Sequence, residues 1–173
     1  MPGESAIIVP VQLPVAIRRL RDGLDPAAAQ GVPPHITLLY PFMSPQDVDD
    51  RVRADVARII VSEPAFAFVL RGVGRWPDSV YLTPEPDEPF SRLTRRLAAA
   101  YPDFPPYAGK HAIADLVTHV TIAQSDRADY LDAAAHALPP LLPVRAFARE
   151  AWLIAPEPGS RWRTLHKLPL ADG

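Results

Sequence analysis

A short apolar stretch carrying two polar residues on one side is the strongest pattern in the chain. Residues 33–42 alternate between the two types of position and therefore predict a β-strand. Successive side chains of a strand face opposite ways, which puts His35 and Thr37 on one face and Ile36 and Leu38 on the other. Such a polar pair is either a hydrogen-bonded structural feature or part of a functional site.

The same arrangement returns about half a chain length later. Residues 117–123 also predict a strand, with His119 and Thr121 on one face and Val120 and Ile122 on the other. A single histidine and threonine on a strand would favour the structural interpretation. Because the pair occurs twice, we interpret all four residues as catalytic or ligand-binding.

The remaining apolar pattern predicts alternating helices and strands. Helices are expected over residues 15–24, 44–60, 87–101 and 128–138, and further strands over residues 6–11, 66–73, 79–83, 144–155 and 162–168. The two halves of the chain hold similar sets of elements, which predicts an α+β fold of two pseudo-symmetric lobes, each an antiparallel sheet with helices. We expect residues 1–173 to form one such domain, with the polar strand faces lining a cleft between the lobes.

Composition narrows the possible partners. The 173 residues include no cysteine, so a disulfide framework and thiolate metal sites are excluded. A formal net charge of −2 argues against a protein that coats duplex nucleic acid. No apolar run has the length of a bilayer-spanning helix, and the N-terminus lacks the basic start of a signal peptide. We therefore expect a cytoplasmic monomer without a membrane partner.

Two opposed histidines suit acid and base catalysis at a phosphodiester. Imidazole has an ordinary pKa of about 6.5, so it exchanges protons near neutral pH. One histidine would take a proton from the attacking water while the other gives a proton to the leaving oxygen. The hydroxyls of Thr37 and Thr121 would hold phosphate oxygens between the rings. This chemistry needs no metal or other cofactor, and the five histidines show no familiar zinc-ligand spacing.

Both motifs resemble the signatures of a known family. Residues 34–42 and 119–122 are similar to the two motifs of the 2H phosphoesterase superfamily, within it the 2′-5′ RNA ligase-like branch, and residues 162–165 resemble its last strand. The resemblance implies metal-free hydrolysis of 2′,3′-cyclic phosphates, on RNA 3′ ends or small nucleotides, to 2′-phosphomonoesters. It also implies that His35 is the acid, that His119 is the base, and that Thr37 and Thr121 hold the phosphate.

Two positions depart from the cyclic phosphodiesterase pattern. Thr118 and Gln124 stand where that branch often has proline and arginine, which weakens the case for RNA ends as the substrate. Two alternatives therefore stay open. One is a hydrolase of another small cyclic nucleotide, of the ADP-ribose 1″,2″-cyclic phosphate type. The other is a binding module that holds a nucleotide or an RNA end without converting it.

Several aromatic and basic residues are candidates for substrate contacts. Trp162 and Arg163 could stack a base and attract phosphate, and Tyr40 is a further candidate; a solvated edge strand is the alternative for the first two. Trp76 and Tyr81 have a weaker claim, because an aromatic near a turn often only covers the core. Arg18, Arg19 and Arg21 are expected to form a solvent-facing helix surface. The remaining histidines are expected to be surface or structural residues: His111, His136 and His166.

Overall fold

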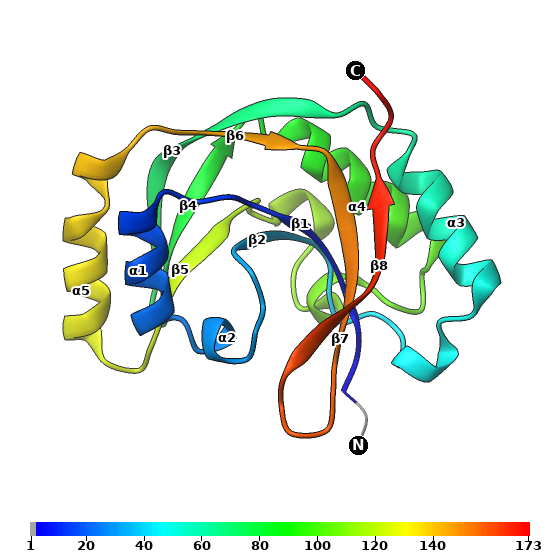
Figure 1. Ribbon diagram of the computed structural model, residues 1–173, viewed down its shortest axis with the longest axis horizontal. Helices are drawn as coiled ribbons and strands as arrows, with labels where there is room; N and C mark the ends of the chain where they lie inside the picture. The colour runs from blue at the N-terminus through cyan, green and yellow to red at the C-terminus, as the bar shows by residue number, and fades with distance from the viewer. Residues whose placement is uncertain (1–2) are drawn as a thin grey trace.

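The computed structural model describes residues 3–173 (Figure 1). Its strands are β1 (Ala6–Pro10), β2 (His35–Leu39), β3 (Phe66–Trp76), β4 (Ser79–Glu85), β5 (Val120–Gln124), β6 (Val144–Ala148), β7 (Glu150–Pro156) and β8 (Trp162–Pro169). Within residues 3–173 they form one curled eight-stranded sheet in the order β6-β3-β4-β5-β2-β1-β7-β8. Every pair of neighbouring strands is antiparallel.

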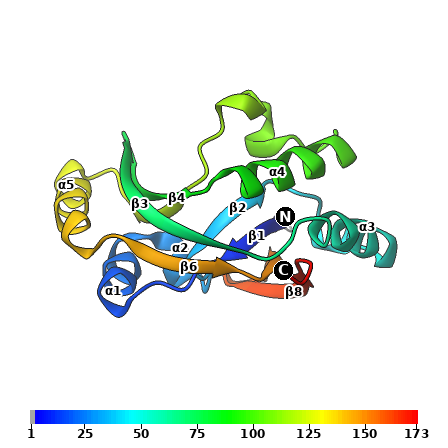
Figure 2. The same ribbon diagram turned by 90° about the horizontal axis from the view of Figure 1, so that it is seen from above.

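Helices pack along this sheet and at its ends. They are α1 (Val15–Leu24), α2 (Pro26–Ala29), α3 (Asp50–Ile60), α4 (Glu88–Ala100) and α5 (Ala128–Ala137), with short 3₁₀ turns at Pro45–Asp47, Pro106–Gly109, Ile113–Asp115 and Pro139–Leu141. Seen from above, α5 lies at one end of the molecule and α3 at the other (Figure 2). Helix α1 packs against β5, and helix α4 packs against β2.

The sheet consists of two similar halves that meet between β2 and β5. These central strands share a single paired position, Ile36 with Val120, whereas the other neighbouring strands pair over several residues. Four strands lie on each side of this junction. Helix α1 precedes β2 but packs on β5, and α4 precedes β5 but packs on β2, so the halves interlock. The predicted α+β fold with two related halves is confirmed.

Hydrophobic side chains of the central strands join those of the helices in one core. Ile36 and Val120 lie in the same buried cluster as Ile17 of α1 and Leu93 of α4. Since neighbouring residues of a strand face opposite ways, this packing turns the histidine-bearing faces of β2 and β5 away from that core. His35 and Thr37 on β2 are half-buried, and so are His119 and Thr121 at β5.

Two predicted elements differ from the structure. The single strand expected over residues 144–155 is broken at Arg149, because β6 pairs with β3 whereas β7 pairs with β1 and β8. The helix expected over residues 44–60 begins only at Asp50. Its cap is the carboxylate of Asp49, which accepts a hydrogen bond from the Val52 backbone amide at 2.8 Å.

The prediction of a solvent-facing Arg21 is wrong. Its side chain is only 2% exposed, and it forms an ion pair with Asp25 at 3.0 Å. The guanidinium also donates a hydrogen bond of 2.9 Å to the carbonyl oxygen of Val32. These contacts tie α1 to the loop that leads into β2. Arg18 and Arg19 are exposed, as predicted.

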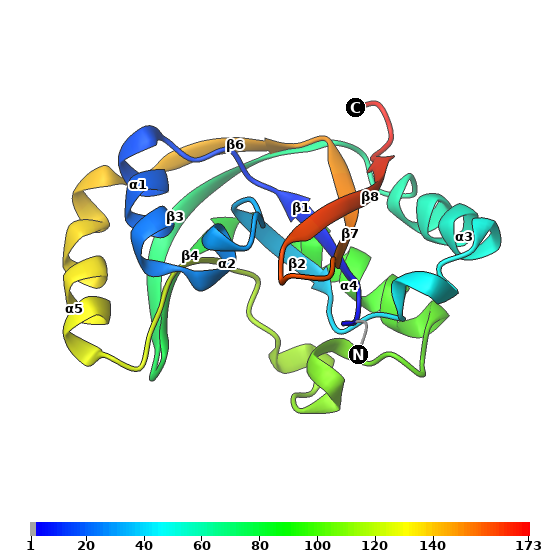
Figure 3. The ribbon, with the colours of Figure 1, turned by 60° about the horizontal axis from the view of Figure 1, so that its bottom comes forward.

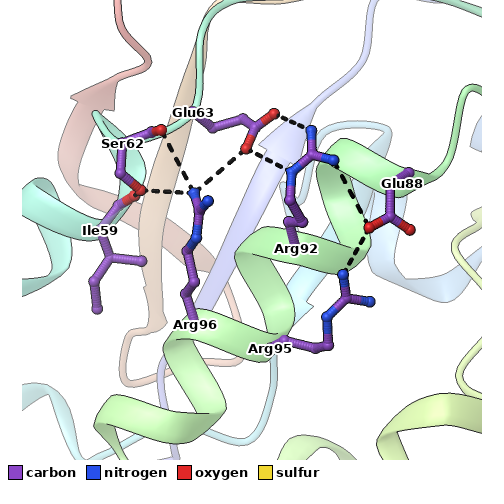
Figure 4. Close-up of polar contacts among 7 residues, drawn as sticks. All are labelled: Ile59, Ser62, Glu63, Glu88, Arg92, Arg95 and Arg96. Carbon is purple, nitrogen blue, oxygen red and sulfur yellow. Dashed lines mark hydrogen bonds and ion pairs between the residues drawn. The ribbon is translucent and has the colours of Figure 1, made fainter.

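A network of ion pairs fastens the loop after α3 to helix α4 (Figure 4). Glu63 is only 4% exposed, and its carboxylate accepts hydrogen bonds of 3.1 and 2.6 Å from Arg92 and one of 3.4 Å from Arg96. Arg96 also donates to the Ser62 hydroxyl at 2.8 Å. Because α4 packs on β2, this network helps to hold the strand that carries His35.

Candidate active site

His35 and His119 are anchored in the same way. His35 is the first residue of β2, and His119 directly precedes β5. Nδ1 of His35 lies 2.8 Å from the Pro33 carbonyl oxygen, and Nδ1 of His119 lies 2.7 Å from that of Val117. A carbonyl oxygen only accepts hydrogen bonds, so each Nδ1 carries the proton when the ring is neutral. Each Nε2 therefore keeps a free lone pair that can take a proton.

The register at the sheet junction brings the two predicted pairs together. Because Ile36 pairs with Val120, antiparallel geometry places His35 beside Thr121 and His119 beside Thr37. Residues opposite one another on such a ladder share a face. The histidines then lie on one diagonal of a four-residue group, where residues are typically about 7–8 Å apart and their Cβ atoms somewhat closer. We call this group the histidine–threonine quartet.

Burial favours the neutral form of both imidazoles. Loss of hydration lowers the pKa of His35 to about 4, against an opposing effect of its bond to the Pro33 carbonyl. The positive charges of Arg21 and His119 add to the lowering of this pKa. Loss of hydration also lowers the pKa of His119, while its bond to the Val117 carbonyl raises it. Two neutral rings with free Nε2 atoms are ready to accept protons.

An aromatic wall surrounds His119. The ring of Trp76 packs edge-on against the His119 imidazole with centroids 4.8 Å apart, and the ring of Tyr81 lies 5.3 Å from it. Trp76 and Tyr81 also pack against each other at 4.1 Å. Gly74 leaves the space that the Tyr81 ring occupies, because a Cβ atom there would overlap that ring. These two aromatics had only a weak claim from the sequence pattern, and pairing of β4 with both β3 and β5 brings them to the site.

The three substrate-contact residues predicted from the sequence lie on the His35 side of the site, where Tyr40 and Trp162 lie close together and Arg163 pairs with another residue. Tyr40 is exposed and its ring lies 6.3 Å from that of Trp162. Trp162 packs against a small apolar cluster that includes Ile8. Ile8 pairs with Thr37, so this aromatic pair belongs to the same half of the sheet as His35. Arg163 is exposed and forms an ion pair of 3.2 Å with Glu157.

Tyr107 is a site residue that the sequence motifs missed. It lies in the segment 102–118, which projects beyond the sheet and returns to β5 (Figure 3). Its backbone amide donates to the Tyr40 carbonyl at 2.6 Å. Burial raises the pKa of the Tyr107 hydroxyl, and the nearby Thr37 side chain lowers it. Tyr107 has φ of 52° and Ala108 has φ of 55°, which non-glycine residues seldom adopt and which cluster at functional sites. The proline-rich, aromatic composition of the segment was the only sequence signal.

Two cavities meet at Tyr107. One of about 230 Å³ is lined by Thr37 and Tyr40, and the other, of about 410 Å³, is lined by His119 and Trp76. Tyr107 lines both. The site therefore has room on either side of Tyr107 for two parts of a small polar ligand.

Among residues 3–173, no cluster of three histidine, cysteine, aspartate or glutamate side chains has an arrangement suited to a metal ion. Over the same residues, no helix combines the length and apolar character needed to cross a membrane.

Comparison with known proteins identifies the family. Residues 9–166 match the family model of the 2′-5′ RNA ligase superfamily. The chain belongs to this superfamily, which confirms the family suggested by the two motifs. No curated protein matches the chain.

Solved structures share the fold at low sequence identity. Escherichia coli LigT complexed with 3′-AMP is 17% identical, with a TM-score of 0.59 over 98% of this chain and 99% of LigT. The Thermus thermophilus protein TT0787 is 21% identical, with a TM-score of 0.61 over 97% of this chain and 98% of that protein. LigT complexed with ATP is 19% identical, with a TM-score of 0.54 over 99% of both chains. At these identities the likeness establishes the fold.

Proposed function

We propose that the protein hydrolyses 2′,3′-cyclic phosphates, at RNA ends or on nucleotides, to 2′-phosphomonoesters. The observation that carries this proposal is the matched anchoring of His35 and His119 on one face of the sheet, each with a free Nε2. Membership in a superfamily of phosphoesterases supports the same class of reaction. LigT in its complexes with 3′-AMP, ATP and NADP⁺ is a nucleotide-binding protein of the same fold, which supports a nucleotide as the ligand here.

In the proposed reaction, His119 takes a proton from water as the water oxygen bonds to phosphorus. The bond between phosphorus and the ribose 3′ oxygen breaks, and His35 gives a proton to that oxygen. The phosphate stays on the 2′ oxygen. Hydroxyls of Thr37 and Thr121 hold the non-bridging oxygens where negative charge gathers. The base and the acid of the reaction are thus both side chains of this protein.

The environment of His35 sets a condition on its role as the acid. With a pKa of about 4, its ring is neutral at pH 7. A bound phosphate anion favours the protonated ring and raises this pKa. His35 therefore gains its proton when substrate binds, and substrate binding at neutral pH is accompanied by proton uptake.

The test is turnover of 2′,3′-cyclic mononucleotides and of a short RNA ending in a cyclic phosphate, in buffer containing EDTA. Products are resolved as 2′- or 3′-phosphates. Formation of the 2′-phosphate supports the proposal. Formation of a 3′-phosphate, or dependence on added metal, would contradict it.

Two other outcomes correspond to the alternatives drawn from the sequence. Hydrolysis of ADP-ribose 1″,2″-cyclic phosphate, without turnover of 2′,3′-cyclic substrates, would identify a hydrolase for another small cyclic nucleotide. Micromolar affinity for nucleotide monophosphates, without product from any cyclic phosphate, would identify a binding module. Both outcomes would overturn the proposal.

A further inference from the structure

A large cavity begins next to the histidine–threonine quartet. Its volume is about 1100 Å³, and Pro10, Pro33 and Pro34 form part of its wall. Pro10 pairs with His35 across the β1–β2 ladder, and the Pro33 carbonyl accepts the His35 hydrogen bond. Pockets for single small molecules typically measure about 300–1,000 Å³. This cavity therefore offers more room than one nucleotide needs, within one residue of His35.

Unpaired positive charge lines the cavity. Arg18, Arg145 and Arg149 are exposed on its wall. None of the three takes part in the ion pairs formed within residues 3–173. The carboxylate in the wall, that of Glu150, accepts a hydrogen bond of 2.6 Å from the Trp152 indole. On a chain with a net charge of −2, such a local excess of arginine favours an anionic ligand.

Aromatic faces accompany these charges. Phe147 is 45% exposed, and the Arg149 guanidinium lies 4.5 Å from the centre of its ring. Trp152 faces the Lys167 ammonium at 4.6 Å. Phe147 and Arg145 lie two residues apart on β6 and so share a face, which is the exposed one. Interleaved arginine and aromatic side chains suit stacked bases joined by phosphates.

We propose that this cavity binds the single-stranded RNA nucleotides that precede a terminal 2′,3′-cyclic phosphate. The inference rests on the proposed function, and it makes a cyclic-phosphate-ended oligonucleotide a better substrate than a cyclic mononucleotide. The arginines contact backbone phosphates, and Phe147 and Trp152 stack bases without selecting sequence. The terminal cyclic phosphate then lies at the quartet while the preceding nucleotides lie over Pro10 and Pro33.

Kinetics with two substrates test this assignment. The variant Arg145→Ala/Arg149→Ala removes two cations of the cavity, and Arg58→Ala removes an exposed arginine of α3 that pairs with Asp55. We expect the double variant to raise KM for a pentanucleotide ending in a cyclic phosphate at least about tenfold, and to change kcat/KM for a cyclic mononucleotide less than about twofold. Arg58→Ala should change neither. Equal losses for both substrates, or no loss for either, would overturn the proposal.

Salt dependence gives a second readout. Each phosphate contact to a single strand contributes about 0.7 to the slope of log affinity against log salt concentration. Because the double variant lacks two such contacts, the slope measured for pentanucleotide binding should be smaller by about 1.4 than in the wild type. The variant Phe147→Leu should weaken binding of the pentanucleotide while leaving the slope unchanged. An unchanged slope in the double variant would exclude direct phosphate contacts by Arg145 and Arg149.

Binding measurements separate this inference from the proposed reaction. A fluorescent pentanucleotide ending in a 2′-phosphate is titrated with the wild type and the double variant, and anisotropy reports binding. Weaker binding by the double variant supports the assignment of the cavity, whether or not cyclic phosphates are hydrolysed. Weaker binding without hydrolysis of any cyclic phosphate would overturn only the proposed reaction. Turnover of cyclic mononucleotides, with equal oligonucleotide affinity in both proteins, would overturn the cavity alone.

Discussion

His35 and His119 share one mode of anchoring: each ring nitrogen Nδ1 meets the carbonyl oxygen two residues earlier, at 2.8 and 2.7 Å. This local bond fixes the neutral tautomer and turns Nε2 outward on both strands. The pairing of Ile36 with Val120 then sets the two rings on one face. Local backbone bonds orient each ring, and the sheet junction sets their separation.

Removal of either ring should abolish hydrolysis without unfolding the protein. For His35→Ala and His119→Ala we expect losses of about 10²–10⁴-fold in kcat, the usual contribution of one proton-transfer group. His136→Ala is the control, because His136 is exposed on α5. Activity assays with circular dichroism check the result. Near-full activity in either active-site variant would contradict paired-histidine catalysis.

Loss of a threonine hydroxyl should cost less than loss of a histidine. In Thr37→Val the phosphate loses one hydrogen bond and the Tyr107 hydroxyl loses a polar neighbour, while Thr121→Val removes the phosphate contact alone. We expect about 10–100-fold lower kcat/KM for both, since a hydrogen bond to a charged group contributes about 1.5–3 kcal/mol. Tyr107→Phe should reproduce part of the Thr37→Val effect. An unchanged kcat/KM in both threonine variants would contradict a phosphate-holding role.

The maximum of kcat/KM should lie at a lower pH than the ordinary histidine pKa of about 6.5 would give. A profile of kcat/KM reports the free enzyme, in which the His35 pKa is about 4 and the His119 pKa lies below 6.5. We therefore expect a bell-shaped profile whose maximum lies below pH 6.5. The profile of kcat should lie at higher pH, because bound phosphate raises both pKa values. A kcat/KM maximum above pH 7 would contradict these environments.

The same lowered pKa values predict acid sensitivity of the fold. Below pH 6.5 the unfolded chain protonates both histidines while the folded site resists protonation, so the unfolded state binds more protons. The free energy of unfolding should fall as pH decreases from 6.5 toward 4. Urea titrations at several pH values measure this fall. His35→Gln, which lacks the titrating ring, should show a shallower dependence.

Gly74 should tolerate no side chain, because a Cβ atom there overlaps the Tyr81 ring. Tyr81 is buried and packs on His119, so Gly74→Ala should displace the ring, lower kcat and reduce stability by about 1–3 kcal/mol. Gly23→Ala is a matched control, since a Cβ on this helix α1 residue would meet no atom within 4 Å. It should raise stability by about 0.5–1 kcal/mol and leave kcat unchanged. Thermal unfolding and activity assays measure both variants.

The sequence by itself determined the elements and the four residues of the quartet. Alternation along a strand is a local property, so His35 with Thr37, and His119 with Thr121, could be placed on shared faces without coordinates. The repeated motif likewise predicted two related halves and the superfamily. The break at Arg149 was missed because the residues on both sides of it are mostly apolar and resemble one continuous strand; only the different partners of β6 and β7 separate them.

Tertiary structure alone decided which distant residues meet. Pairing of β4 with both β3 and β5 carries Trp76 and Tyr81 to His119, and the left-handed turn at Tyr107 brings its hydroxyl near Thr37. Burial of Arg21 could not be foreseen either, because the carbonyl that it binds belongs to the loop before β2. Periodicity fixes which face a side chain takes, whereas pairing register and burial depend on contacts between segments far apart in the chain.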